Sequence, residues 1–456
     1  MAAHTSTFLR EMDWRGQVQP NGCTDPAGLD AHLAQAGRRA YVGFDPTADS
    51  LTIGNLVGIM ALARWQRCGH TPVAVMGGGT GLIGDPSGKS AERTLNTEEV
   101  VRSNVEKIRG IFERGELFEK GSASTDGGAL RIVNNIDWLG KLGFLEALRD
   151  IGKHFSVNMM IQKDSVKERL HNRDQGISYT EFSYMILQAY DFFWLRQHEG
   201  VSVQMGGSDQ FGNIVTGIDL IRKKAVPGSA TKDITGHLPE VAPAARVDAF
   251  GLTWPLVTKA DGGKFGKTES GAIWLSSHRT SPFAYSQFWL NAADADVVRF
   301  LKTFTFLSQE EVGALEHKVK TEPGAREAQR VLAREATAII HGRTEAANAE
   351  GAARALFSGE ISGLPLATLE EVLASAPSST HGRSLLEAGV PLLDLLVDTK
   401  LAASKREAKE FLGSGSVSVN GRKAGAEEKV GTRDLLHGTI IALRRGKKQW
   451  HVTRWG

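Results

Sequence analysis

The chain has 456 residues, of which 41% are hydrophobic and 23% charged, and its formal net charge is +2. This composition is typical of a soluble globular protein of about two to four domains, and it gives no global charge that would attract nucleic acid. No apolar run reaches the length of a membrane span, and two cysteines, Cys23 and Cys68, exclude a disulfide framework. We therefore predict a cytoplasmic protein without a membrane partner.

Residues 1–39 are predicted to form a polar, helical lead-in, and residues 39–79 a strand, a turn, a helix and a second strand. The helix covers about residues 50–68, and Gly69 stands where its C-terminal cap belongs. The apolar run at residues 71–76 reads as a buried parallel strand. This spacing predicts a βαβ unit and an α/β fold with a Rossmann-like parallel sheet.

The turn between the first strand and its helix is rich in small polar residues. It carries Asp45 and Thr47, and the helix opens with Thr52, Gly54 and Asn55. Free backbone N–H groups at such a helix start favour an anion. The segment resembles the first nucleotide-binding signature of class I aminoacyl-tRNA synthetases, most closely in the tyrosyl enzymes. That signature usually ends in His-Ile-Gly-His, so this chain has Thr52 and Asn55 in place of the two imidazoles.

Two generic motifs follow the second strand. Residues 79–84 match the Gly-x-Gly-x-x-Gly dinucleotide fingerprint, and residues 84–90 imitate a P-loop. The turn that begins at Asp85 stands where the first motif needs a helix, and Ile83 stands where the second needs its first glycine. We expect neither motif to bind a nucleotide in those ways.

Two further motifs place polar side chains near predicted strands. A helix carries a phenol, an amide and a carboxylate on one face, and a strand at residues 200–205 leads into a glycine-rich polar turn. Each motif alone also fits a surface pair or an ordinary turn. Together they favour a site at the carboxyl ends of the strands, formed by Tyr184, Gln188, Asp191, Gly207, Asp209 and Gln210.

A glycine-rich loop at residues 258–271 carries Lys264, Lys267 and Thr268. Lysine on a mobile loop can reach a phosphate as charge develops there, although an exposed basic turn is the simpler interpretation of the loop alone. The run Lys-Phe-Gly-Lys-Thr resembles the second class I signature in its tyrosyl form.

The end of the chain is basic, with 13 Lys and Arg against 7 Asp and Glu from residue 391 onward. Residues 405–421 resemble a small RNA-binding module that also occurs in a ribosomal small-subunit protein. Its cations would contact RNA phosphates, whereas the alternative is a solvated basic tail. The candidate RNA-binding residues are Lys405, Arg406, Lys409, Arg444, Arg445, Lys447 and Lys448.

These motifs occur in the order found in bacterial-type tyrosyl-tRNA synthetases, and the resemblance covers nearly the whole chain. It implies that Tyr41 and Asp191 contact the phenol of a bound L-tyrosine. It also implies that the tyrosine ammonium and backbone are held by Asp85, Tyr184, Gln188 and Gln210. The resemblance further implies an ATP site lined by Asp45, Gly54, Gly207, Asp209 and Lys267, with catalytic roles for Thr47, Thr52, Asn55, Lys264, Lys267 and Thr268.

The implied activity is formation of tyrosyl-adenylate from L-tyrosine and ATP, followed by transfer of the tyrosyl group to tRNA(Tyr). ATP would bring Mg²⁺ with it, no protein-held metal is expected, and the family implies a homodimer. The alternative is a non-catalytic RNA-binding paralogue, which Thr52 and Asn55 favour. We expect a Rossmann-like catalytic domain over residues 1–245, a linker with the lysine loop over 246–281, an α-helical domain over 282–355, a linker over 356–388 and an α+β RNA-binding domain over 389–456.

Overall fold

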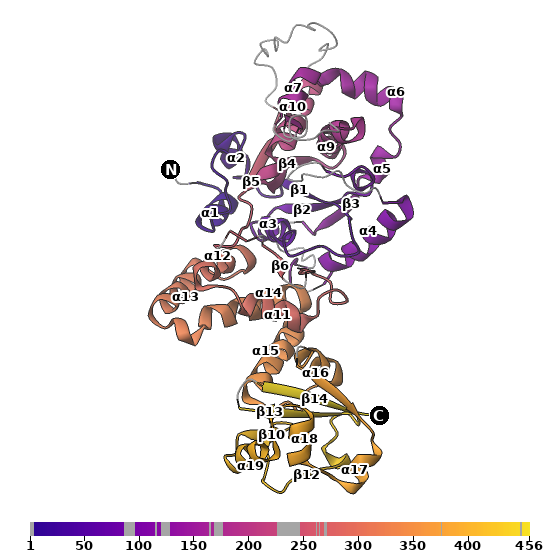
Figure 1. Cartoon of the computed structure of the whole chain (residues 1–456). Helices are drawn as coiled ribbons and strands as arrows, with labels where there is room; N and C mark the ends of the chain where they lie inside the picture. The colour runs from indigo at the N-terminus through magenta and orange to yellow at the C-terminus, as the bar shows by residue number, and fades with distance from the viewer. Residues whose placement is uncertain are drawn as a thin grey trace. The chain divides into compact units, whose positions relative to one another are not determined.

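The structure is a computed structural model that describes residues 4–85, 96–114, 116–119, 128–163, 166–167, 177–225, 247–260, 262–263, 265–268, 271–374, 376–446 and 449–456. The chain forms two compact parts (Figure 1). The first comprises Met1–Ser281 and Phe288–Gly342, and the second comprises Pro282–Gln287 and Arg343–Gly456. The helical domain predicted over residues 282–355 is therefore divided between the two parts.

A five-stranded parallel sheet forms the centre of the first part. Its strands are β1 (Arg39–Phe44), β2 (Thr71–Met76), β3 (Arg131–Asn134), β4 (Val201–Gly207) and β5 (Phe250–Trp254). They lie in the order β3-β2-β1-β4-β5, with every neighbouring pair parallel. The order reverses beside β1, and ligands of such sheets bind outside the carboxyl ends of the strands at this point.

Helices cover both faces of this sheet, which confirms the predicted α/β class (Figure 1). Tyr41 and Val73 point to the face where α9 (Tyr179–His198) and α10 (Phe211–Ala225) supply Phe192 and Ile214 to one apolar cluster. The opposite face packs against α3 (Leu56–Arg67). Because successive strand residues alternate between the faces, one strand serves both layers.

The remaining helices of the first part lie before and after the sheet strands. The predicted lead-in contains α1 (Thr7–Trp14) and α2 (Pro26–His32). Others are α4 (Glu98–Phe112), α5 (Ile136–Leu139), α6 (Phe144–Glu146), α7 (Val157–Ile161), α12 (Asp294–Phe304), α13 (Gln309–Thr321) and α14 (Glu327–His341). No helix in the described ranges is both long and apolar enough to cross a membrane.

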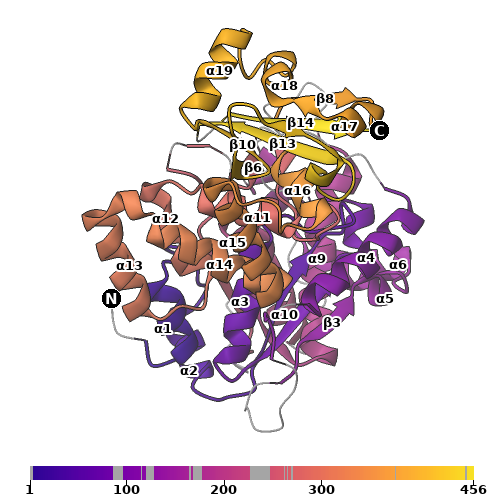
Figure 2. The ribbon, with the colours of Figure 1, turned by 90° about the horizontal axis from the view of Figure 1, so that it is seen from below.

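The second part contains a mixed sheet with helices on both faces. The sheet order is β11-β10-β13-β14-β8, and Figure 2 shows α18 and α19 on one side of it and α16 on the other. The strands are β8 (Ser378–His381), β10 (Val417–Val419), β11 (Arg422–Lys423), β13 (Ile440–Arg445) and β14 (Gln449–Trp455). The helices are α15 (Arg343–Ser358), α16 (Leu366–Val372), α17 (Ser384–Ala388), α18 (Leu392–Asp398) and α19 (Lys405–Gly413), and α11 (Pro282–Leu290) precedes them in the chain.

Residues 356–388 carry more structure than the linker with little core that their composition suggested. They include α16, β8 and α17, and β8 pairs with β14 in parallel. Ile361 and Leu369 are fully buried in a cluster with Ile440 and Val452 of the sheet. A few well-spaced apolar residues among Gly, Ser and Pro are therefore enough to extend the core of the second part.

Candidate active site

The carboxyl edge of the parallel sheet gathers most of the polar residues predicted to form the site. Asp45 follows β1, Gly77 follows β2, Asn135 follows β3, and Ser208 follows β4. A side chain at Gly77 would place its Cβ 2.7 Å from Asp45 Oδ1, so the glycine leaves room for that carboxylate. The carboxyl edge of the sheet beside β1 thus carries polar side chains, and Gly77 gives the Asp45 carboxylate the room it needs.

A buried phenol and a buried carboxylate lie together at this edge. Tyr41 on β1 is 2% exposed, and its hydroxyl has no hydrogen-bond partner among the described residues. Asp191 on α9 is 4% exposed. Burial raises the pKa of Tyr41 well above its ordinary value, and the neighbouring Asp191 charge raises it further. An unpartnered hydroxyl beside a carboxylate is suited to a ligand that carries a hydroxyl of its own.

Two donors that we did not identify in the sequence hold Asp191. Trp138 Nε1 donates to Asp191 Oδ1 at 2.7 Å, and Asn135 Nδ2 donates to Asp191 Oδ2 at 3.0 Å. Asn135 Nδ2 also donates to Thr80 Oγ1 at 2.9 Å, and the Trp138 indole stacks on Trp194 at 4.3 Å. Burial raises the pKa of Asp191 to about 7, against the lowering effect of the two donors. The sequence feature that could have identified Asn135 as a site residue is its position directly after a predicted strand.

A second hydrogen-bond network at this end of the sheet joins five side chains. Gln188 Nε2 donates to Gln210 Oε1 at 3.1 Å, and Gln210 Nε2 donates to Asp85 Oδ2 at 2.8 Å and to Asp209 Oδ2 at 3.2 Å. Asn213, which sequence reasoning missed, donates from Nδ2 to Gln188 Oε1 at 2.9 Å. The structure thus brings together residues from α9, from the turn after β4 and from the segment after β2.

Tyr184 lies buried on α9, one turn before Gln188. Gly207 ends β4, and a Cβ there would lie 2.6 Å from Asp209 Oδ1, so the glycine lets that carboxylate turn back toward the strand. The predicted site residues on α9 and at the end of β4 therefore lie at one end of the sheet.

The first signature forms a turn before α3. Thr47 and Gly54 are exposed, whereas Thr52 and Asn55 are half-buried. Asn55 Oδ1 accepts hydrogen bonds from Thr52 N at 3.0 Å and from Thr52 Oγ1 at 2.9 Å. Asn55 is the N-cap of α3 but makes no side-chain cap bond to the helix. The Asn55 side chain therefore stabilises the turn and does not cap the helix.

The second signature lies directly against the first. Lys267–Thr268 forms β6 and pairs with Gly271–Ala272, which forms β7, while Lys264 lies outside the described residues. Ile273 N donates to Gly266 O at 3.0 Å, and Ile53 N donates to Ile273 O at 2.9 Å. A Cβ at Gly266, which has a φ of 77°, would lie 2.5 Å from Ile53 Cγ2. Main-chain bonds thus link the two signatures.

The basic residues predicted to bind RNA fall into two groups in the second part. Arg406 and Lys409 are exposed on α19, and exposed Lys405 forms an ion pair with Asp394 at 2.6 Å. Arg444 is 6% exposed, and its Nη2 donates to Phe357 O at 3.0 Å.

Arg445 Nη1 donates to Leu401 O at 2.7 Å, and its guanidinium lies over the Phe411 ring. Lys447 and Lys448 lie outside the described residues. Arg444 is therefore buried and bonded within the module, whereas the sequence suggested an exposed cation, and the Arg445 side chain is 26% exposed.

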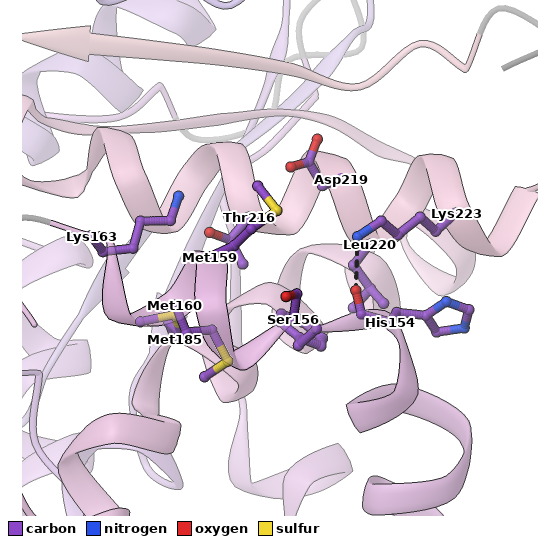
Figure 3. A pocket seen from close by; sticks show the side chains of 11 residues that line it. His154, Ser156, Met159, Met160, Lys163, Met185, Thr216, Asp219, Leu220 and Lys223 are labelled. Atoms are coloured by element: carbon purple, nitrogen blue, oxygen red, sulfur yellow. Dashed lines mark hydrogen bonds between the residues drawn. The ribbon is translucent and has the colours of Figure 1, made fainter. Parts of the chain in front are cut away.

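A separate cavity lies between α7, α9 and α10, and no predicted site residue lines it (Figure 3). Met159, Met160 and Met185 form its apolar side, and Lys223 Nζ donates to His154 O at 2.8 Å on its polar side. No group of three or more His, Cys, Asp or Glu is placed to hold a metal ion in the part of the chain that the structure describes.

Comparisons with known proteins match nearly the whole length of the chain. The family described as tRNA synthetases class I (W and Y) matches residues 34–358, and the tyrosine--tRNA ligase SYY-like C-terminal domain matches residues 369–453. The tyrosine--tRNA ligase of Geobacillus kaustophilus is 47% identical over 98% of this chain and 99% of its own length. That of Aliivibrio fischeri is 46% identical over 99% of both chains.

Solved structures agree with these matches. The C-terminally truncated mitochondrial tyrosyl-tRNA synthetase of Aspergillus nidulans has a TM-score of 0.64 and 29% identity, covering 77% of this chain and 94% of its own. The corresponding Coccidioides posadasii structure has a TM-score of 0.63 and 32% identity, covering 77% and 92%. The non-catalytic alternative gains no support from these matches. With its buried phenol–carboxylate pair and its two linked signatures, the chain belongs to the class I tRNA synthetases of the W and Y group, and within that group to the tyrosine--tRNA ligases.

Proposed function

We propose that this chain activates L-tyrosine with ATP and transfers the tyrosyl group to the 3′ end of tRNA(Tyr). The observation that carries the proposal is the unpartnered Tyr41 hydroxyl beside the buried Asp191 carboxylate. The phenolic O–H of tyrosine would donate to Asp191, and Tyr41 would donate to the phenolic oxygen. Such a site disfavours phenylalanine, because its polar groups would then stay unpaired; tyrosyl-tRNA synthetases are the established example of this rule.

In the first step, a carboxylate oxygen of tyrosine attacks the α-phosphorus of ATP. The bond from that phosphorus to the bridging oxygen breaks, and pyrophosphate leaves. Asp85, Tyr184, Gln188 and Gln210 would hold the tyrosine so that its carboxylate is aligned for attack, and the network joining Gln188, Gln210 and Asp85 supports this role.

The nucleotide would occupy the neighbouring end of the same sheet edge. The adenosine part would lie along Asp45, Gly54, Gly207 and Asp209, and Mg²⁺ would arrive bound to the ATP phosphates. Catalysis would be electrostatic, from donors and cations around the leaving pyrophosphate. The residues proposed to act in this step, either by contacting the phosphates or by positioning a residue that does, are Thr47, Thr52, Asn55, Lys264, Lys267 and Thr268.

In the second step, a hydroxyl of the terminal tRNA ribose attacks the tyrosyl carbonyl carbon, and AMP leaves. The second part of the chain would bind the tRNA through phosphate contacts. Exposure favours Lys405, Arg406 and Lys409 of α19 for these contacts. Arg444 and Arg445 would support them by keeping the module folded, and Lys447 and Lys448 stay predictions.

A homodimer is the proposed assembly. Exposed apolar side chains gather along the segment from α6 to α7, namely Phe144, Leu145, Leu148, Val157, Met159 and Ile161. Exposed apolar side chains concentrated on one short segment favour an interaction site there. The cytoplasmic location suggested by the cysteine content also stays a prediction.

The test is charging of a tRNA(Tyr) transcript with labelled tyrosine by the purified full chain. We expect tyrosine to be esterified and phenylalanine to be left unused at equal concentration. Binding of tRNA(Tyr) without any charging would contradict the proposal and would favour the non-catalytic paralogue.

A further inference from the structure

The turn that replaces the usual pair of histidines fixes its own asparagine. Thr52 N and Thr52 Oγ1 both donate to Asn55 Oδ1, at 3.0 and 2.9 Å. A backbone N–H can only donate, so the Asn55 atom that faces it is the amide oxygen. The amide nitrogen, Nδ2, therefore points away from Thr52, and no hydrogen bond joins it to any other residue in the described ranges.

These two hydrogen bonds leave Thr52 and Asn55 with different hydrogen-bonding capacity toward a ligand. The Thr52 hydroxyl has one proton, and that proton is directed at Asn55 Oδ1. Its oxygen is left with lone pairs only, and the phosphate oxygens of ATP are also acceptors. Asn55 Nδ2 carries two N–H donors. Only Asn55 therefore presents a side-chain donor from this pair to a nucleotide.

The frame that holds Thr52 is made of main-chain bonds. Thr52 forms an antiparallel bridge with Trp274, Ile53 N donates to Ile273 O, and Leu275 N donates to Leu51 O. These bonds flank the Thr52 peptide and fix the direction of its N–H. The Asn55 carboxamide is thus held at its oxygen by a donor pair on a rigid frame, which is the arrangement that preorganised catalysis requires.

We propose that Thr52 is a positioning residue, which acts on ATP only by orienting the carboxamide of Asn55, the donor that the first signature offers to the nucleotide. This inference rests on the proposed function and assigns the roles within the first signature. It explains how a threonine can occupy a histidine position without supplying a donor of its own to the phosphates.

The sharpest test of Asn55 is the isosteric change Asn55→Asp. It keeps the oxygen that accepts from Thr52 and replaces the Nδ2 donors by a second, negatively charged acceptor. We expect kcat/KM for ATP in tyrosine-dependent pyrophosphate exchange to fall about a hundredfold or more. Tyrosine binding at equilibrium without ATP should be unchanged, which shows that the variant is folded. An Asn55→Asp variant with near-normal exchange would overturn the proposal.

The test of Thr52 is a double-mutant cycle with a matched control. Thr52→Val removes the hydroxyl, keeps the shape and leaves the Thr52 N–H bond, so we expect a loss of about three- to tenfold, whereas Thr52→Ser should stay within about twofold. In an Asn55→Ala background, Thr52→Val should cause no further loss. An equal loss in both backgrounds would show that Thr52 contacts the nucleotide itself and would overturn the proposal.

ATP binding by equilibrium dialysis provides a readout that needs no turnover. The same ranking, with Asn55→Asp weakest and Thr52→Ser close to the parent chain, is expected there. If the parent chain failed to catalyse exchange but this ranking held, the proposed function would be wrong and the roles of Thr52 and Asn55 would stand.

Discussion

The proposed amino-acid side and the proposed nucleotide side of the site are built differently, although both stand on the carboxyl edge of one sheet. On the amino-acid side, Asp191 is buried and held by Trp138 and Asn135, two side chains from the segment after β3. On the nucleotide side, Thr47 and Gly54 are exposed, and Asn55 is held by its own turn.

This contrast indicates which substitutions the amino-acid side and the nucleotide side of the site can tolerate. In a buried pocket, removing one partner leaves other polar groups unpaired, so every member is needed. In a half-buried turn at the protein surface, water can replace a lost contact, and a different donor can take over the role. A histidine pair can therefore be replaced by Thr52 and Asn55 at lower cost than Asp191 could be replaced.

The largest predicted effect on the use of tyrosine comes from removing the buried carboxylate. Asp191→Ala should lower kcat/KM for tyrosine by about a hundredfold or more, because Trp138 Nε1 and Asn135 Nδ2 lose their acceptor along with the substrate phenol. Asp137→Ala, an exposed position on α5, is the matched control and should be close to normal. Equal losses in the two variants would remove the distinction between the two sides of the site.

The pH dependence of tyrosine binding should follow Asp191. Its pKa is raised to about 7, so the acceptor form grows as pH rises, and tyrosine affinity should increase about tenfold per pH unit below that value. In the absence of tyrosine, the folded protein binds this proton more tightly than the unfolded chain does. The Asp191 contribution to the free energy of unfolding is therefore fully present below about pH 4 and decreases as the pH rises to about 7. In Asp191→Asn, the pH dependence of tyrosine affinity and that of the unfolding free energy should both vanish. If either pH dependence persisted, another titrating group would be its cause.

A smaller effect is expected from Trp138→Phe, which keeps an aromatic ring but removes the indole N–H. The lost donor raises the pKa of Asp191 further, so KM for tyrosine near pH 7 should rise about five- to tenfold and recover partly at higher pH. Trp194→Phe, in the ring stacked on Trp138, should leave the pH profile unchanged. An identical pH shift in both variants would point to packing as the cause.

The smallest effect concerns the link between the two signatures. Gly266→Ala places a Cβ against Ile53, and we expect a three- to fivefold lower kcat for exchange, on the order of 1 kcal/mol, with KM for tyrosine unchanged. Gly262→Ala shares the positive φ but meets open space, so it isolates the backbone strain. A kcat for Gly266→Ala that matches Gly262→Ala would show that the contact with Ile53 has no role in catalysis.

Local patterns in the sequence predicted much of this molecule. The βαβ unit, the strand before Gly207 and the shared helix face of Gln188 and Asp191 all follow from short-range periodicity. Asn135 and Trp138 could not be found in this way, because their contact with Asp191 depends on how β3 pairs in the sheet and on the helix that packs over it. They are 56 and 53 residues away from Asp191.

In the second part of the chain, too, local sequence patterns did not predict contacts that depend on the tertiary structure. Arg444 and Arg445 look like an exposed basic pair in the sequence, but strand alternation and a carbonyl at Phe357 place the Arg444 guanidinium inside. The core contributed by residues 356–388 depends on the parallel pairing of β8 with β14, which local composition cannot indicate.

Tyrosine-dependent exchange of labelled pyrophosphate into ATP by the purified full chain tests the central claim most directly. The buried pair of Tyr41 and Asp191 predicts exchange with tyrosine, none above background with phenylalanine, and loss of the tyrosine signal in Asp191→Ala. Exchange that does not distinguish the two amino acids, or that survives in Asp191→Ala, would contradict the account.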